Sequence, residues 1–281
     1  MVPIVTPLVI AHRGASARRP EHTRSAYAQA IADGADGLEC DVQLTADGEL
    51  VCWHDATVDR TSDGSGPVRE HTLAQMRGLD ITSWAGMADQ GDELLTLSDL
   101  LALAGRASRP IHVAVELKHP APYGFAAEDA VVALLEAAGW DPGPSTVGPV
   151  TVSFMSFHPG SLQHLAGSVP SEHLMVLVDA TDAADLLAEQ GLPVTAEAQR
   201  TLQMLLDEAV LIVDDGQSGG VGPSVAFVRA HPDKVARWIA GGTLVRVWTV
   251  DSAEDLALCR ELGVAEVTTN VPDQVLALLG R

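Results

Sequence analysis

Two carboxylates on one face of a short strand are the clearest chemical signal in the chain. The stretch from Gly37 to Asp55 reads GLECDVQLTADGELVCWHD, and its first half alternates apolar with polar side chains. Because successive side chains of a strand point to opposite faces, Glu39 and Asp41 share a face, about 6–7 Å apart. Such carboxylates raise each other's pKa unless a cation lies between them. Hard cations such as Mg²⁺ or Ca²⁺ take oxygen ligands of this kind.

A histidine follows the second half of this stretch, which reads as a strand from 50 to 53. His54 suits proton transfer near neutral pH. The Asp47-Gly48 dipeptide is typical of a hairpin turn, and we expect a hairpin to carry His54 away from the carboxylates. An extended return of some seven residues can span about 23 Å and would bring His54 to their end, so we expect the return. The alternative is an edge strand with an exposed polar face and a chance histidine.

Strands alternate with helices over nearly the whole chain, which predicts a (β/α)₈ TIM barrel in a single domain, 1–281, with a small insertion at about 56–95 after the third strand. An open doubly wound sheet is the rival, but His-Arg-Gly-Ala after the first strand is not a glycine-rich phosphate loop.

The strand candidates number nine or ten, so we expect one misreading within 192–222, which holds an apolar run at 210–213 and the glycine-rich GQSGGVGPS. Strands are expected at about 8–11, 37–44, 50–53, 111–118, 150–157, 173–178, 244–250 and 265–268, and helices at about 24–33, 96–104, 124–138, 159 onward, 182–190, 196–208, 232–240, 252–262 and 272 onward.

Polar residues stand at the ends of several predicted strands, and strand ends converge on one face of a barrel. Three carboxylates there suit one divalent ion, two cations suit phosphate oxygens, and two histidines suit a general base and a general acid. The residues concerned are His12, Arg13, Glu39, Asp41, His54, Glu116 and Lys118.

Seven segments, taken in order, resemble the glycerophosphodiester phosphodiesterase family, whose barrel is shared with phosphatidylinositol-specific phospholipases C. Each segment alone is a weak signal, whereas the ordered set is specific and covers nearly the whole chain. The segments are AHRGASARRPEHT (11–23), GLECDVQLTADGELVCWHDATVDRTSDGSG (37–66), TLSDLLAL (96–103), VELKHP (115–120), SFHPGSL (156–162), VRVWTVDS (245–252) and TTNVPD (268–273).

The resemblance implies metal-dependent hydrolysis of glycerophosphodiesters, such as glycerophosphocholine or glycerophosphoethanolamine, to sn-glycerol 3-phosphate and an alcohol. It implies one divalent cation, Mg²⁺ or Ca²⁺, bound by three carboxylates. The implied ligands are Glu39, Asp41 and Glu116, the implied catalytic pair is His12 and His54, and the implied phosphate ligands are Arg13 and Lys118.

Four positions depart from the family pattern, which often has Asn at His22, Asn at Asp251, Asp at Asn270 and Pro at Leu95. None of them is a proposed ligand or catalyst, so we expect effects on substrate preference and not on the reaction. Near the end of its strand, Trp248 is a candidate wall of the glycerol or head-group pocket, with a core tryptophan as the alternative.

The composition of the chain limits the kinds of partner that the protein can bind. A net charge of −21 argues against nucleic acid and against stable association with an anionic membrane. Cys40, Cys52 and Cys259 follow no metal-ligand spacing and suggest reduced thiols. With no signal peptide and no apolar run of about 18 residues recognised, we expect a cytoplasmic protein acting on a small molecule. The oligomeric state is left open.

Three other functions remain as alternatives. A lysophospholipase D would run the same chemistry on lysophospholipids and would need an apolar slot. An amide-cleaving metallohydrolase typically has His-x-His at the first strand's end, but Gly14 stands two residues after His12. A non-catalytic binding barrel would not need the complete set of carboxylates and histidines.

Overall fold

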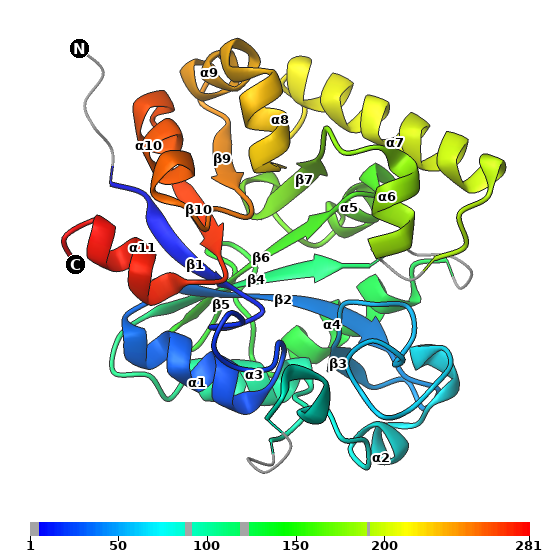
Figure 1. Cartoon of the computed structure of the whole chain (residues 1–281). Coiled ribbons are helices and arrows are strands. Elements are labelled where there is room, and N and C mark those ends of the chain that lie inside the picture. Colours follow the sequence, from blue (N-terminus) through cyan, green and yellow to red (C-terminus); the bar gives the residue numbers. More distant parts are fainter. Residues whose placement is uncertain (1–5, 88–91, 119–123, 190–191) are drawn as a thin grey trace.

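Eight parallel strands close into a barrel in the computed structural model, which describes residues 6–87, 92–118, 124–189 and 192–281. The barrel closes because the first strand pairs with both the second and the last (Figure 1), so the predicted (β/α)₈ fold is confirmed. The barrel strands are β1 (Leu8–His12), β2 (Gly37–Leu44), β4 (Ile111–Leu117), β6 (Val150–Ser156), β7 (Leu174–Val178), β8 (Gly220–Pro223), β9 (Leu244–Val247) and β10 (Glu266–Thr269), and two short antiparallel additions are β3 (Leu50–Cys52) and β5 (Thr146–Val147).

Helices cover the outside of the barrel (Figure 1), and several begin where the sequence predicts. Thr23 caps α1 and Gly34 ends it in the left-handed conformation. Thr96 and Asp99 form a capping box at the start of α3. Within the described residues, no helix is long and apolar enough to cross a bilayer. The helices are α1 (Arg24–Asp33), α2 (Leu73–Met76), α3 (Leu97–Ala104), α4 (Ala126–Ala137), α5 (Pro159–Leu165), α6 (Ala183–Glu189), α7 (Ala196–Asp214), α8 (Val225–Ala230), α9 (Pro232–Ala240), α10 (Ala253–Leu262) and α11 (Pro272–Leu278).

The connection between β2 and β3 is a hairpin, so the expected extended return is wrong. The two strands are antiparallel, with Val42 opposite Cys52. The expectation that a hairpin would separate His54 from the carboxylates is also wrong. Because β2 continues beyond Asp41 before the turn, the returning chain passes that residue again, and the Trp53 amide donates to the Asp41 carbonyl at 3.0 Å. The hairpin itself therefore brings His54 to the carboxylates.

The misread strand lies in 192–222, as expected. The apolar run at 210–213 belongs to the end of α7, and the barrel strand β8 comes from the glycine-rich segment. Its glycines permit close packing, since a Cβ on Gly222 would lie 2.6 Å from Leu177 Cδ2 in β7. Glycine has low strand propensity, which is why composition hid this strand.

The predicted insertion connects β3 to α3 and has a small core of its own. Residues 88–91 within it, and residues 119–120 of the VELKHP segment, lie outside the described part of the chain. The insertion packs against the hairpin and reaches the barrel mouth, where Arg60 contributes to the cavity described below. The core that this segment shares with the hairpin consists of Val51, Trp53, Val58, Val68, Met76, Ile81 and Leu94.

A buried ion pair fills part of the barrel interior. Arg246 on β9 donates to Glu266 on β10 at 2.6 Å, and its guanidinium also reaches Ser153 at 3.3 Å. His112 hydrogen-bonds the same Ser153 at 2.7 Å. Breaking a buried pair of this kind leaves an uncompensated charge, so these residues support the barrel as a unit.

Gly14 fixes the loop that follows β1, and replacing it with alanine should destabilise the protein more than the same change at Gly48. Both glycines have a left-handed backbone, with φ of 86° and 81°. A Cβ at Gly14 would lie 2.6 Å from the Ala26 carbonyl carbon, whereas nothing lies within 4 Å of one at Gly48. We expect Gly48→Ala to cost about 1–2 kcal/mol of unfolding free energy and Gly14→Ala to cost a further ~1–3 kcal/mol for overpacking. Urea denaturation measures both, and equal losses would contradict the predicted clash.

Candidate active site

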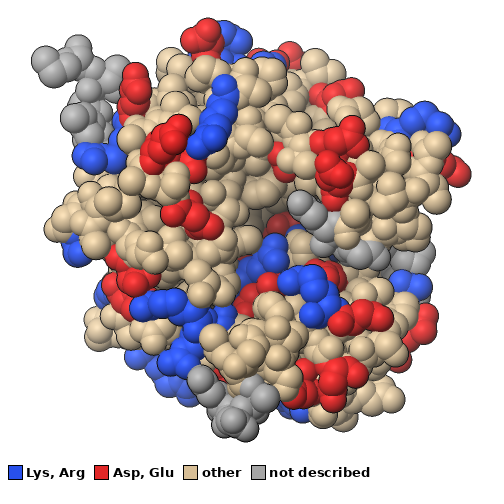
Figure 2. Space-filling model, viewed as in Figure 1, with Lys and Arg blue, Asp and Glu red and all other residues tan. Residues whose placement is uncertain are grey.

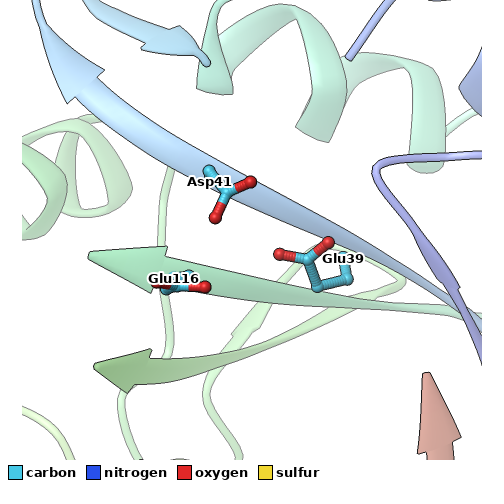
Figure 3. Close-up of side chains that lie close together, drawn as sticks. All are labelled: Glu39, Asp41 and Glu116. Carbon is cyan, nitrogen blue, oxygen red and sulfur yellow. The ribbon is translucent and has the colours of Figure 1, made fainter. Parts of the chain in front are cut away.

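Three carboxylates from β2 and β4 meet near the mouth of the barrel. Asp41 lies opposite Glu116 in the parallel pairing of the two strands, and Glu39 lies on the same face of β2. One oxygen from each residue lies within 4.8 Å of the others. Figure 3 shows the three groups pointing toward one another. All three are buried, so water screens their repulsion poorly.

The pKa values of the three carboxyl groups are shifted in different directions by burial and by neighbouring charges. Burial and the charge of Asp41 raise the pKa of Glu39 well above its usual value, and burial raises the pKa of Glu116 to about 7. Burial also opposes ionisation of Asp41, but Lys118 and Arg13 outweigh it and hold the pKa of Asp41 well below its usual range. Without further positive charge, a proton therefore stays on one of the carboxyl groups near neutral pH.

The cluster fits a divalent cation. Hard cations take carboxylate oxygens as ligands. Glu39 Oε1 is buried and accepts no hydrogen bond from the described residues, and a buried oxygen without a partner is costly. A cation held by Glu39, Asp41 and Glu116 would satisfy that oxygen and neutralise the repulsion.

Two basic side chains compensate part of the negative charge. Lys118 Nζ lies 2.7 Å from Asp41 Oδ1 and 2.5 Å from Glu116 Oε1. Arg13 Nε lies 3.1 Å from Asp41 Oδ2, and the Arg13 amide donates to Glu39 Oε2 at 2.9 Å. The φ of Arg13 is 56°, a conformation that non-glycine residues adopt seldom and that concentrates at functional sites.

A chain of charged contacts holds the His54 ring. His54 Nδ1 lies 2.7 Å from Asp55 Oδ1. Arg60 donates to Asp55 Oδ2 at 2.7 Å and to Glu21 Oε1 at 2.8 Å. Burial and the charge of Lys118 lower the pKa of His54 to about 4. The ring is thus neutral at rest and fixed through Nδ1.

His12 is fixed through a different partner. Its Nδ1 lies 2.8 Å from Asn270 Oδ1, and its Nε2 lies 3.9 Å from Glu39 Oε2. Burial and the charge of Arg13 lower the pKa of His12 to about 3. Both histidines therefore face the cavity as neutral rings at rest, one supported by an amide and the other by a carboxylate.

His22, one of the departures from the family pattern, supports the carboxylate cluster from behind. It is buried, and its ring nitrogens lie 2.9 Å from Asp41 Oδ2 and 2.8 Å from Tyr27 Oη. Its backbone amide also donates to the Arg13 carbonyl at 3.1 Å. His22 thereby ties the loop after β1 to the carboxylate cluster.

The cavity at the barrel mouth has a polar half and an apolar half and a volume of about 390 Å³. Figure 2 shows basic and acidic side chains gathered around a hollow on this face. Trp248 belongs to the apolar half, where its indole nitrogen donates to the Gly222 carbonyl at 2.7 Å and its ring meets Phe157 edge-on at 5.7 Å between centroids. The other apolar side chains of this half are Met155, Leu177 and Leu186.

The structure brings all the predicted site residues together. Asp41 is fully buried beneath the cavity, and the others line it: His12, Arg13, Glu39, His54, Glu116, Lys118 and Trp248. The sequence alone indicated no role for Asp55 or for Arg60. Asp55 is adjacent to His54, a signal that could have found it, whereas Arg60 lies in the insertion within no pattern that points to a site.

Comparison with known proteins agrees with this geometry. A model of the glycerophosphoryl diester phosphodiesterase family matches residues 12–274. A Mycobacterium tuberculosis protein named "Probable glycerophosphodiester phosphodiesterase 1" is 38% identical over 278 residues, covering 97% of this chain and 92% of that protein. A glycerophosphodiester phosphodiesterase of Bacillus subtilis is 30% identical over 274 residues, covering 95% and 84%.

A solved structure shares the fold. The phosphodiesterase of Oleispira antarctica, in complex with the product sn-glycerol-3-phosphate, superposes with a TM-score of 0.73 at 23% identity, covering 98% of this chain and 97% of that one. Because the family match spans nearly the whole chain, the earlier resemblance is confirmed. This chain belongs to the glycerophosphoryl diester phosphodiesterase family.

Proposed function

We propose that this enzyme hydrolyses glycerophosphodiesters, such as glycerophosphocholine or glycerophosphoethanolamine, to sn-glycerol 3-phosphate and an alcohol. The observation that carries the proposal is the grouping of three buried carboxylates, two imidazoles and two cations around one cavity of about 390 Å³. A cavity of this size suits a small organic ligand. The product found in the Oleispira antarctica structure supports the same product for this chain.

We propose that the enzyme uses one divalent cation, Mg²⁺ or Ca²⁺, held by Glu39, Asp41 and Glu116. The support is the buried oxygen of Glu39 without a hydrogen-bond partner and the repulsion among the three groups. When bound, such an ion polarises the phosphate and offsets its negative charge.

We assign the remaining steps to the basic side chains and the histidines. Arg13 and Lys118 bind non-bridging phosphate oxygens through charge-assisted hydrogen bonds. His12 accepts a proton from the attacking oxygen. His54, neutral in the substrate-free site, takes up a proton when the anionic phosphate binds and raises its pKa, and it then gives that proton to the leaving alkoxide. The hydrogen-bond partners of the two rings support this assignment of base and acid. The Asp55 carboxylate favours a protonated His54 ring, whereas the Asn270 amide beside His12 carries no charge. The attacking oxygen is water or the substrate's own glycerol hydroxyl.

We further propose that residues 1–281 act as a single cytoplasmic domain on a small-molecule substrate, without nucleic acid or stable membrane association. The net charge of −21 supports the absence of polyanionic partners. Cys40, Cys52 and Cys259 are buried and unpaired, which suits a reducing compartment.

The apolar half of the cavity favours a second candidate, a lysophospholipase D. Leu177, Leu186, Met155 and Phe157 line that half beside Trp248. These side chains can pack on the carbons of a glycerol or head group, or on the first part of an acyl chain.

Removing either imidazole should lower turnover strongly. We expect His12→Gln and His54→Gln to reduce kcat by about 10²- to 10⁴-fold, because each ring transfers a proton in the reaction. The assay is glycerol 3-phosphate release from glycerophosphocholine and from glycerophosphoethanolamine, with EDTA, Mg²⁺ and Ca²⁺ in parallel. EDTA should abolish release and one ion should restore it. His164→Gln, on the exposed surface, is the matched control, and full activity in either site variant would remove that histidine from the mechanism.

Cation binding by the metal-free protein should strengthen as the pH rises. The ion must displace a proton from Glu116, with a pKa of about 7, or from Glu39, whose pKa is also raised. At pH values below those pKa values, the dissociation constant of the cation should fall about tenfold for each unit by which the pH rises, for each proton displaced. Calorimetry in buffers of different ionisation enthalpy counts the protons released. Glu39→Gln should weaken binding while the exposed Glu136→Gln should not, and affinity independent of pH would contradict proton displacement.

Acyl-chain dependence separates the two candidate substrates. If the apolar half binds an acyl chain, each added CH₂ contributes about 0.8 kcal/mol, and kcat/KM should grow roughly fourfold per carbon. We expect no such growth across a series of lysophosphatidylcholines assayed below their micelle concentrations, and higher kcat/KM with glycerophosphocholine. Steady growth with chain length that Leu186→Asn removes would establish the lysophospholipase D instead.

A further inference from the structure

Asn270, which contacts the His12 ring, forms a connected pair with Asp251. Asn270 Nδ2 donates to Asp251 Oδ2 at 2.6 Å, and the Asn270 backbone amide donates to Asp251 Oδ1 at 2.8 Å. Thr269 Oγ1 also donates to Asp251 Oδ1, at 2.9 Å. The carboxylate therefore holds Asn270 from both its backbone and its side chain.

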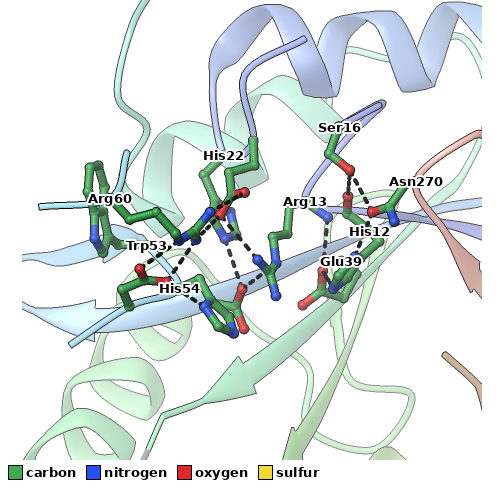
Figure 4. Close-up of polar contacts among 12 residues, drawn as sticks. His12, Arg13, Ser16, His22, Glu39, Trp53, His54, Arg60 and Asn270 are labelled. Carbon is green, nitrogen blue, oxygen red and sulfur yellow. Dashed lines mark hydrogen bonds and ion pairs between the residues drawn. The ribbon is translucent and has the colours of Figure 1, made fainter. Parts of the chain in front are cut away.

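The carboxylate decides which way the Asn270 amide points. An ionised carboxylate only accepts hydrogen bonds, so Asn270 must turn its NH₂ group toward Asp251. Its carbonyl oxygen then faces His12 Nδ1 at 2.8 Å and the Ser16 hydroxyl at 2.7 Å (Figure 4). Ser16 Oγ also lies 2.8 Å from the His12 carbonyl, which places the loop after β1 against Asn270.

The orientation of the amide in turn decides where the hydrogen of the His12 ring lies. A carbonyl oxygen only accepts, so Nδ1 must carry the hydrogen. The lone pair of a neutral ring is then on Nε2, the nitrogen on the side of Glu39. If the amide were reversed, its NH₂ group would call for the other tautomer, and the nitrogen facing the cavity could not accept a proton.

We propose that Asn270 and Asp251 are positioning residues that act as a pair: together they hold His12 as the tautomer with its hydrogen on Nδ1 and its accepting nitrogen in the cavity. The inference rests on the proposed function only for the role of His12 as a base. The pair needs one amide and one carboxylate in contact, and either residue can carry either group. With Asp at 270 and Asn at 251, a carboxylate would accept from Nδ1 and the amide would donate to that carboxylate.

Exchange of the two residues tests the pair. Asn270→Asp alone puts two carboxylates in contact, and Asp251→Asn alone removes the acceptor that orients Asn270. We expect each single variant to lower kcat by about 10- to 100-fold with little change in KM, because the pair positions a catalytic group and does not touch substrate. The double variant Asp251→Asn/Asn270→Asp should recover most of the lost kcat, giving a strongly non-additive cycle. Asp233→Asn, an exposed carboxylate on α9, is the matched control, and thermal unfolding of all variants identifies any loss that comes from misfolding.

Measuring which nitrogen of His12 carries the hydrogen in the substrate-free protein tests this inference independently of the proposed function. In protein labelled with ¹⁵N-histidine, His12 should show a protonated Nδ1 and an unprotonated Nε2 near neutral pH, and Asp251→Asn should remove that preference. This measurement needs neither substrate nor turnover, so it stands even if no glycerophosphodiester is hydrolysed. Hydrogen on Nε2 in the unaltered protein, or a double variant no more active than the weaker single one, would overturn the proposal.

Discussion

The burial of three carboxylates on two neighbouring strands is the constraint on which the rest of the site depends. Glu39, Asp41 and Glu116 repel one another where water cannot screen them, so each must receive compensating charge or keep a proton. Lys118 and Arg13 supply part of that charge. The cation that we propose would supply the remaining positive charge, and it would let a protein of net charge −21 bind an anionic phosphate at one point.

The two histidines are supported from opposite parts of the chain. The insertion contributes Arg60, which binds Asp55 beside His54 and also binds Glu21 of the loop after β1. Glu21 in turn accepts from Arg13. The insertion and that loop are therefore braced against each other through charged groups that surround the cavity, and neither would be expected to hold its position alone.

Two departures from the family pattern prove to be in direct contact. The pattern often has Asn at position 251 and Asp at position 270, and this chain has the two residue types exchanged. The exchange preserves one amide and one carboxylate, but it places the amide beside His12. We expected these positions to affect substrate preference, whereas their contacts lead to the ring of a catalytic candidate.

The sequence by itself determined the barrel, the shared face of Glu39 and Asp41, and the approximate starts of most helices, because strand alternation and helix initiation are local properties. It failed at β8, because Gly220 and Gly222, which lie against side chains of β7, have low strand propensity. It also failed for the hairpin, since how far β2 extends past Asp41 depends on pairing with β3 and β4. Only the tertiary structure joined His12 to Asn270, 258 residues away, because barrel closure through β1 and β10 is what brings the two ends of the chain together.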